Sequence, residues 1–279
     1  MAKLERLNSL AQINIKTIES YPRPHLGASV IGHACTRYLV YSFNWAYKNK
    51  ISGKLNRIFR LGDKVEDIII DALRSADIVV EGQQIKVSDS TGHSGGSIDG
   101  LVSNVMEFPD ETLLFEAKSM NHNNFLSTLK KGVQIDKPIY YKQMQMYMGR
   151  LNLKNAMFVA LDKNTSDLII EFVPFDEDVY FELLDKERDV FQANHIEEFP
   201  KISNNPTWFA CKFCGARDKC HGGEKVEQNC RTCKWSEALP EGGVWRCNNT
   251  TPRDTDILSV EDQEKGCDLY EIDGMWGEV

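Results

Sequence analysis

The chain has 279 residues, 42% apolar and 27% charged, so it is long and apolar enough to bury a full core and is not expected to be disordered. Its 33 basic and 41 acidic side chains give a formal net charge of −8, which argues against general polyanion binding and confines any nucleic-acid site to a local basic groove. No run has the length of a membrane span, and the N-terminus carries charges and amides where a signal peptide would be apolar, so we expect a soluble cytoplasmic protein with no membrane partner.

The hydrophobic pattern predicts a weakly patterned lead-in over 1–34, followed by a mixed α/β domain. In chain order, the expected elements are helices over 34–48 and 59–76, strands over 78–87, 95–105 and 112–120, a helix over 137–151, strands over 155–162 and 168–175, and a helix over 176–195. The first three strands are separated by short polar loops, which favours an antiparallel meander. The helix over 59–76 is expected to bury an apolar face made of Leu61, Val65, Ile68, Ile69 and Leu73.

Three charged residues stand where burial is expected. Asp99 follows Ile98 in a glycine-lined run, and Glu116 follows three apolar residues. Side chains two apart in a strand share a face, so Glu116 and Lys118 point the same way. If the two strands pair, Asp99 joins them, and two close carboxylates form an oxygen site suited to Mg²⁺ or Mn²⁺. The alternative is an ordinary surface ion pair, but charges at burial-prone positions usually have a partner or an ion.

Polar groups on two apolar helices point to the same place. Glu66 lies four residues after Gly62, and Gln143 and Tyr147 lie one turn apart on the helix over 137–151. For any one of them alone, a solvated or core position is the more common role.

The ordered motifs resemble a known family. Gly62-x-x-x-Glu66, Gly-Ser-Ile-Asp99-Gly, Glu116-Ala-Lys118 and Gln143-x-x-x-Tyr147 look like the RecB-type branch of the PD-(D/E)XK nuclease superfamily. More narrowly, GGSIDG, FEAKSM and KPIYYKQMQMYMG resemble phage-encoded exonucleases and exonucleases of CRISPR adaptation. The resemblance implies a restriction-endonuclease-like core, a mixed central sheet flanked by helices, with a cysteine-rich metal-binding extension at the C-terminus.

The same resemblance implies roles for the site residues. Asp99 and Glu116 would be Mg²⁺ or Mn²⁺ ligands, with Glu66 supporting the metal directly or through water. Lys118 would orient or deprotonate the attacking water, and Gln143 and Tyr147 would position the substrate or the lysine.

The sequence departs from the family pattern at one place. Many relatives have a histidine in the first helical motif, which residues 62–66 lack. His93 lies upstream of Asp99 and is a candidate to approach the site, although a loop histidine is more often solvated.

Seven of the eight cysteines lie in the last 69 residues, and clustered thiols in an intracellular chain favour metal binding. Cys211, Cys214 and Cys220 form a trio that is one thiol short of four, and Cys35 is the remote candidate for the fourth. The resemblance implies a [4Fe–4S] cluster held by these four thiols. Zinc is the alternative, bound either by the same four thiols or by the trio with His221, in which case Cys35 is a packed thiol.

The last four cysteines form a second set. Cys230, Cys233, Cys247 and Cys267 begin with a CxxC pair, which is typical of a closed structural zinc site. The expected organisation is therefore a lead-in over 1–34, a nuclease core over 35–207, a cluster segment over 208–225 and a zinc module over 226–279.

Two runs of basic residues lead toward the proposed site. They are Lys48, Lys50, Lys54, Arg57 and Arg60, and Lys130, Lys131, Lys137 and Lys142. With Tyr140, Tyr141 and Tyr147 as candidate stacking rings, they favour DNA as the substrate, single-stranded or with free ends. Taken alone, a charge run is more often a solvated face than a groove, and tyrosines at helical spacing are more often core residues.

The predicted function is a metal-dependent exonuclease that hydrolyses phosphodiester bonds from DNA ends. By resemblance, it would act in phage DNA recombination, replication or degradation, with a recombination or replication protein as a partner. The alternative is a non-catalytic module, binding nucleic acid or protein, that retains the fold and the metals.

Overall fold

The computed structural model describes residue 13 and residues 17–249 and 255–277. Part of the lead-in predicted over 1–34, residues 1–12 and 14–16, lies outside the described residues, as do positions 250–254 and 278–279 of the predicted zinc module.

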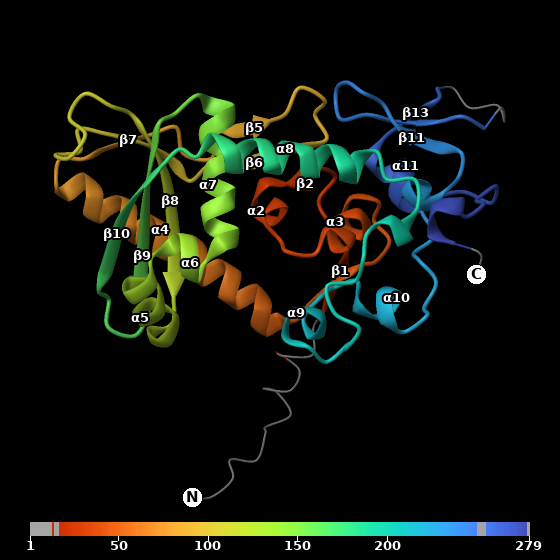
Figure 1. Cartoon of the computed structure of the whole chain (residues 1–279), viewed down its shortest axis with the longest axis horizontal. Coiled ribbons are helices and arrows are strands. Elements are labelled where there is room, and N and C mark those ends of the chain that lie inside the picture. Colours follow the sequence, from red (N-terminus) through yellow and green to blue (C-terminus); the bar gives the residue numbers. More distant parts are fainter. Residues whose placement is uncertain (1–12, 14–16, 250–254, 278–279) are drawn as a thin grey trace, which may run out of the picture.

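A five-stranded sheet forms the centre of the fold (Figure 1). Its strands, in spatial order, are β10 (Leu168–Pro174), β9 (Asn155–Asp162), β8 (Leu113–Met120), β7 (Gly100–Ser103) and β4 (Val79–Glu81). Strands β8 and β9 are parallel and the other neighbours are antiparallel. The sheet is therefore mixed and flanked by helices, as predicted.

Helices cover both faces of this sheet. Helix α4 (Gly53–Ser75) lies on one face and α7 (Pro138–Leu151) lies on the other, and α8 (Glu177–Phe191) packs against α7 and extends away from the sheet (Figure 1). Residues of β8 alternate between the two resulting cores, with Leu113 and Phe115 packed in the core that contains α4 and Leu114 in the core that contains α7. A strand covered on both sides must be apolar on both sides, which explains why β8 begins with an unbroken apolar run.

Helix α4 differs from its prediction at its start and on its buried face. It begins at Gly53, because the Ser52 side chain caps it by accepting from the Leu55 N–H at 3.2 Å. Its buried residues are Val65, Ile69, Ile70 and Leu73. Leu61 and Ile68 are 49% and 56% exposed, so those two expectations were wrong: Ile70 replaces Ile68 on the stripe that meets the sheet.

The predicted meander is interrupted. The segments expected as strands over 78–87 and 95–105 each split between two sheets: β4 and β7 join the large sheet, whereas β5 (Lys86–Ser88) and β6 (Ser94–Ser97) form a small sheet with β2 (Leu26–Gly27). The chain passes from β6 to β7 at Ile98 and Asp99. Asp99 therefore lies at a corner between two sheets.

The remaining elements frame this core. Before α4 come β1 (Ile18–Ser20), α2 (Ala28–Ile31), α3 (Thr36–Phe43) and β3 (Asn49–Ile51), and after β8 come α5 (His122–Lys131) and α6 (Val133–Asp136), neither of which was predicted. The C-terminal part contains η1 (Ile196–Glu198), α9 (Phe209–Lys212), α10 (Arg217–His221), η2 (Cys230–Thr232), β11 (Ser236–Ala238), β12 (Trp245–Cys247), β13 (Ile257–Leu258), α11 (Val260–Lys265) and η3 (Gly274–Trp276). No helix among residues 17–249 and 255–277 combines the length and apolar character needed to cross a membrane.

The C-terminal segment packs into the same core as the N-terminal helices. The buried guanidinium of Arg231 lies 3.9 Å from the Trp45 ring and 4.7 Å from the Trp245 ring. It donates to the carbonyls of Phe43 at 2.9 Å and Pro24 at 2.8 Å. These contacts join residues about two hundred positions apart, so the segment after 226 shares one apolar core with the rest of the chain. The domain boundaries expected from the sequence remain predictions.

Candidate active site

Strand β8 presents Glu116 and Lys118 on one face, as their spacing predicts. The Lys118 ammonium forms an ion pair with Glu116 Oε1 and also donates to the Ala117 carbonyl at 3.1 Å. Ala117, between them, packs in the core on the α4 side of the sheet.

Asp99 joins this pair from the corner between β6 and β7. Strand β7 is in register with β8 so that Gly100 faces Phe115, which brings the preceding residue beside Glu116. Asp99 Oδ2 accepts from the Ala117 N–H at 2.8 Å and lies 3.8 Å from Lys118 Nζ. The ammonium thus lies between two carboxylates, and these three residues are brought together as expected.

Glu116 is fully buried, and a residue of helix α7 holds its side chain in place. Gln143 on α7 donates from Nε2 to Glu116 Oε2 at 3.1 Å. Burial raises the pKa of Glu116 to about 7; the Lys118 ammonium opposes this rise and Asp99 adds to it. Burial alone lowers the pKa of Lys118, but Glu116 and Asp99 outweigh it and hold that pKa above its usual value.

Glu66 approaches from α4. Its Oε1 accepts from Gln84 Nε2 at 3.1 Å. Burial raises the pKa of Glu66, with a further contribution from the Asp99 carboxylate, while Gln84 and Lys118 lower it. A third acidic group therefore lies close to Asp99 and Lys118.

Tyr147 holds the corner between β6 and β7 in place, whereas Lys118 is held by other residues. Its hydroxyl donates to the Ser97 carbonyl at 3.0 Å, two residues before Asp99. Tyr147 and Tyr141 are 1% and 7% exposed, so these two predicted stacking rings are core residues. Tyr140 lines the cleft and has Lys118 Nζ 5.3 Å from its ring centre.

Most of these residues line an open cleft of about 730 Å³, although Glu116 and Tyr141 do not; this volume is within the size range of small-molecule sites. Asp63, Glu66, Asp99 and Lys118 line one side. The sequence interpretation missed the residues that the small sheet and the segment before it contribute. These are Arg23, His25, Gln84, Lys86, Ser88, Ser94 and Ser97. These residues come together only because β2 pairs with β6, and no local pattern in the sequence indicates that pairing.

His93 does not reach this cleft as a ligand and is not solvated. It is 3% exposed, and its Nε2 lies 2.7 Å from the Leu239 carbonyl. Its ring packs against Phe43, Phe191 and Trp245. Both expectations for this histidine were wrong, because the C-terminal segment folds over the loop that carries it.

The first cysteine set surrounds one small hollow. Cys35, Cys211, Cys214 and Cys220 all line it, and so does His221. Burial raises the pKa of Cys214 to about 11, and the neighbouring thiols Cys35, Cys220 and Cys211 add to the rise, so four sulfurs gather here from both ends of the chain. The donor set suits a thiolate-bound centre, and the choice between iron and zinc remains open.

The second set also lines a single hollow. Cys230, Cys233, Cys247 and Cys267 surround it together with Trp235 and Leu269. Within residues 17–249 and 255–277, no group of three or more His, Cys, Asp or Glu side chains has the arrangement of a formed metal site. The iron–sulfur, zinc and Mg²⁺ or Mn²⁺ assignments are therefore taken up below as proposals.

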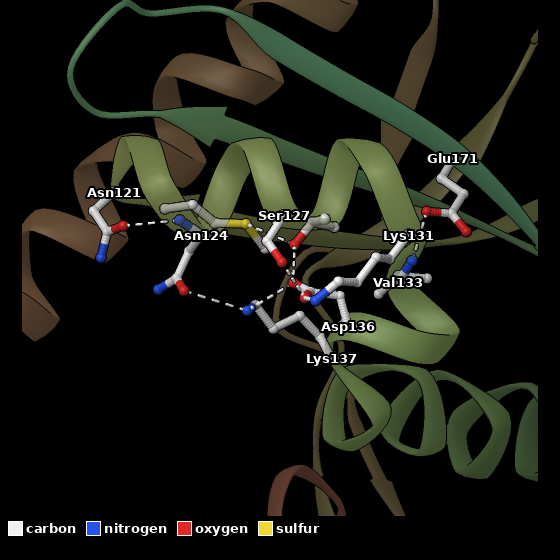
Figure 2. Close-up of polar contacts among 10 residues, drawn as sticks. Asn121, Asn124, Ser127, Lys131, Val133, Asp136, Lys137 and Glu171 are labelled. Carbon is white, nitrogen blue, oxygen red and sulfur yellow. Dashed lines mark hydrogen bonds and ion pairs between the residues drawn. The ribbon is translucent and has the colours of Figure 1, made fainter.

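The second basic run is largely neutralised. Lys131 and Lys137 turn toward Asp136, at 3.4 Å and 2.8 Å, at the junction of α5 and α6 (Figure 2). Lys142 pairs with Glu182 at 3.0 Å. This run stabilises the helix junction and leaves little free charge for DNA.

No protein-family model and no curated protein matches the chain. Among solved structures, the alkaline exonuclease LHK-Exo in complex with dAMP aligns with a TM-score of 0.46 and 19% identity, over 60% of this chain and 86% of that one. The same enzyme from Laribacter hongkongensis aligns with a TM-score of 0.44 and 18% identity over the same shares. A phage-related exonuclease from Haemophilus somnus aligns with a TM-score of 0.34 and 13% identity, over 46% of this chain and 66% of that one. These aligned structures are named as exonucleases.

Proposed function

We propose that this protein is a Mg²⁺- or Mn²⁺-dependent DNA exonuclease that hydrolyses phosphodiester bonds from DNA ends. The observation that carries the proposal is the convergence of Asp99, Glu116 and Lys118: Asp99 and Lys118 line an open cleft, and the Lys118 ammonium lies 3.8 Å from Asp99 and pairs with the buried Glu116. Two carboxylates and a lysine in one place are the parts that metal-assisted phosphodiester hydrolysis requires.

Each residue has a defined task in this proposal. Asp99 and Glu116 would hold the divalent ion, with Glu66 beside them; the bound ion would supply a water of lowered pKa and a charge for the phosphate. Gln143 keeps Glu116 oriented by donating to its second oxygen. Lys118 donates hydrogen bonds to the attacking water or the scissile phosphate, since its pKa is held above the usual lysine value. Tyr147 positions Asp99 through the Ser97 carbonyl.

The two cysteine sets have separate tasks. We assign Cys35, Cys211, Cys214 and Cys220 to a [4Fe–4S] cluster, with zinc as the alternative metal, because all four line one hollow. We assign Cys230, Cys233, Cys247 and Cys267 to a structural zinc ion for the same reason. A closed site of four thiolates has no open position for a water, so neither set takes part in hydrolysis. The proposed setting in phage recombination, replication or degradation, with a recombination or replication protein as a partner, rests on the motif resemblance.

The test compares end-labelled linear DNA with a closed circle of the same sequence. The wild-type protein should release nucleotides from the linear DNA with Mg²⁺ or Mn²⁺ and not with EDTA, and should spare the circle. Asp99→Asn should remove this activity, whereas Glu107→Gln, at an exposed glutamate outside the cleft, should retain it. The proposal fails if no DNA is hydrolysed with either ion, or if Asp99→Asn is as active as the wild type.

A further inference from the structure

A basic and aromatic surface lies beside the first cysteine set, outside the catalytic cleft. Strand β3 and helix α9 border a hollow of about 360 Å³, lined among others by Lys48, Lys50, Lys212 and Phe213. We call Lys48, Lys50, Phe209, Lys212 and Phe213 the β3–α9 surface. None of these residues lines the catalytic cleft.

The two aromatic rings of this surface are open to solvent. Phe209 and Phe213 are 77% and 71% exposed. Their ring centres lie 5.6 Å apart in an edge-to-face arrangement, and Lys212 Nζ lies 5.5 Å from the centre of Phe213. Neither ring packs in the apolar cores, so both could be shortened without loss of core packing. Apolar groups gathered on a surface and accompanied by charge mark an interaction site.

The charged side chains of the β3–α9 surface are all basic. Lys48, Lys50 and Lys212 form no ion pair with any residue that the structure describes. At the rim of the hollow, by contrast, Arg217 pairs with Asp218 and Lys219 pairs with Glu227. Of the acidic residues that line the hollow, Asp218, Glu224 and Glu227 pair with Arg217 and Lys219 at the rim. Glu19 lies opposite Lys50 across strands β1 and β3, and Lys48 Nζ lies 4.9 Å from the centre of the Tyr21 ring, so the three lysines leave the surface with a net positive charge.

The basic character continues toward the catalytic cleft. Between Glu19 and Asp63 the sequence has no acidic residue, although the chain as a whole carries a net charge of −8. Helix α4 begins two residues after β3 and carries Lys54 and Arg60 on its exposed half. Further along, α4 carries Asp63 and Glu66, which line the cleft. Glu66 lies about 18 Å along the helix from Lys54, at 1.5 Å of rise per residue.

We infer that the β3–α9 surface binds a single-stranded segment of the DNA substrate and leads it along α4 to the cleft. Lysines bind the phosphates, and the faces of Phe209 and Phe213 stack on bases. The strand must be single at this point, because a duplex buries the faces of its bases and offers phosphates alone. This inference rests on the proposed function and adds to it the form of the substrate and a second contact region.

The test measures binding of labelled oligo(dT) by fluorescence anisotropy, in EDTA and with Glu116→Gln as the parent, so that hydrolysis does not interfere. Phe209→Ala/Phe213→Ala should weaken binding by about 30-fold or more, since each of the two base–aromatic stacks contributes roughly 1–3 kcal/mol. Phe181→Ala is the matched control, because Phe181 is also exposed, at 53%, and lies on α8. Binding of blunt duplex DNA should change by less than about twofold in the double variant.

The lysines are tested through salt. Lys50→Ala/Lys212→Ala should reduce the slope of log affinity against log salt by about 0.7 for each phosphate that the variant no longer neutralises, whereas Lys154→Ala, at an exposed lysine before β9, should leave it unchanged. Oligo(dT) binding by the Phe209/Phe213 variant that equals the Phe181 control overturns the inference and leaves the proposed exonuclease standing. Failure of the wild type to hydrolyse DNA contradicts the proposed function, whereas Phe-dependent oligo(dT) binding in that case still supports the surface.

Discussion

The corner that carries Asp99 depends on the absence of a side chain at Gly96. A Cβ at Gly96 would lie 2.3 Å from the Tyr147 hydroxyl and 3.5 Å from the ring carbon that bears it. Gly96→Ala therefore forces the hydroxyl away from the Ser97 carbonyl, and the ring, at 1% exposure, has little room to move. We expect a loss of about 1–3 kcal/mol in the free energy of unfolding from overpacking, and about 1 kcal/mol more from the broken hydrogen bond.

Removal of the hydroxyl should rescue this variant. Tyr147→Phe alone should cost about 0.5–1.5 kcal/mol, the usual contribution of one hydrogen bond. In Gly96→Ala/Tyr147→Phe the closest remaining contact of the new methyl group with residue 147 is the ring carbon at 3.5 Å, an ordinary van der Waals distance. The double variant should thus be about as stable as Tyr147→Phe, which corresponds to a coupling energy of about 2–4 kcal/mol, the whole cost of Gly96→Ala.

Urea unfolding of the four proteins measures this cycle, and the rate of DNA hydrolysis measures whether Asp99 stays in place. Gly96→Ala should lower the rate, and the double variant should hydrolyse DNA at the rate of Tyr147→Phe, because both lack the hydrogen bond to Ser97 and neither has the clash. Additive losses in the double variant would refute the reasoning, because they would show that the methyl group meets something other than the Tyr147 hydroxyl.

Three further changes test other parts of the structure. Cys35→Ser should lower the bound iron, or zinc, and the melting temperature although Cys35 is 176 residues from Cys211 (211 − 35); full metal content measured by elemental analysis would show that Cys35 is only a packed thiol. Arg231→Lys should lower the free energy of unfolding by about 2–4 kcal/mol, since an ammonium cannot reproduce the planar stack on Trp45 or the paired donation to backbone carbonyls; an unchanged urea midpoint would contradict this. Burial tends to raise the pKa of Asp136, but Lys137, Ser127 and Thr128 outweigh it and hold that pKa well below its usual range. Asp136→Asn should therefore lower the free energy of unfolding above about pH 4, and this loss should shrink as the pH falls further. A loss that does not change with pH would exclude the charge of Asp136 as its cause.

The sequence predicted the site best where a local period decides the structure. Glu116 and Lys118 share a face because strand side chains alternate, and β9 spans Asn155–Asp162 as expected because it is an unbroken apolar run. Pro138 marks the start of α7 as predicted, since proline suits the first turn of a helix.

The parts that sequence did not reveal depend on contacts between distant segments. The run over 95–105 looks like one strand, because nothing local indicates that Gly95 and Gly96 lie in one sheet and Gly100 in another. Arg23, His25 and Lys86 form one wall of the cleft only because β2 pairs with β6. His93 is buried because its ring packs against Trp245. A hydrophobic pattern does not indicate a contact between residues 152 positions apart (245 − 93).

The central claim is that Asp99, Glu116 and Lys118 form a hydrolytic centre, and single-turnover hydrolysis of linear DNA by Glu116→Gln in Mn²⁺ tests it most directly. The variant keeps the size of the side chain, and Asp99 still faces the Lys118 ammonium at 3.8 Å, so the protein should remain folded although it loses the ion pair with Lys118. Its rate should drop by at least about 100-fold, since even groups that only support metal ligands cost 10- to 100-fold when changed. A folded Glu116→Gln protein that hydrolyses DNA at the wild-type rate would contradict the claim.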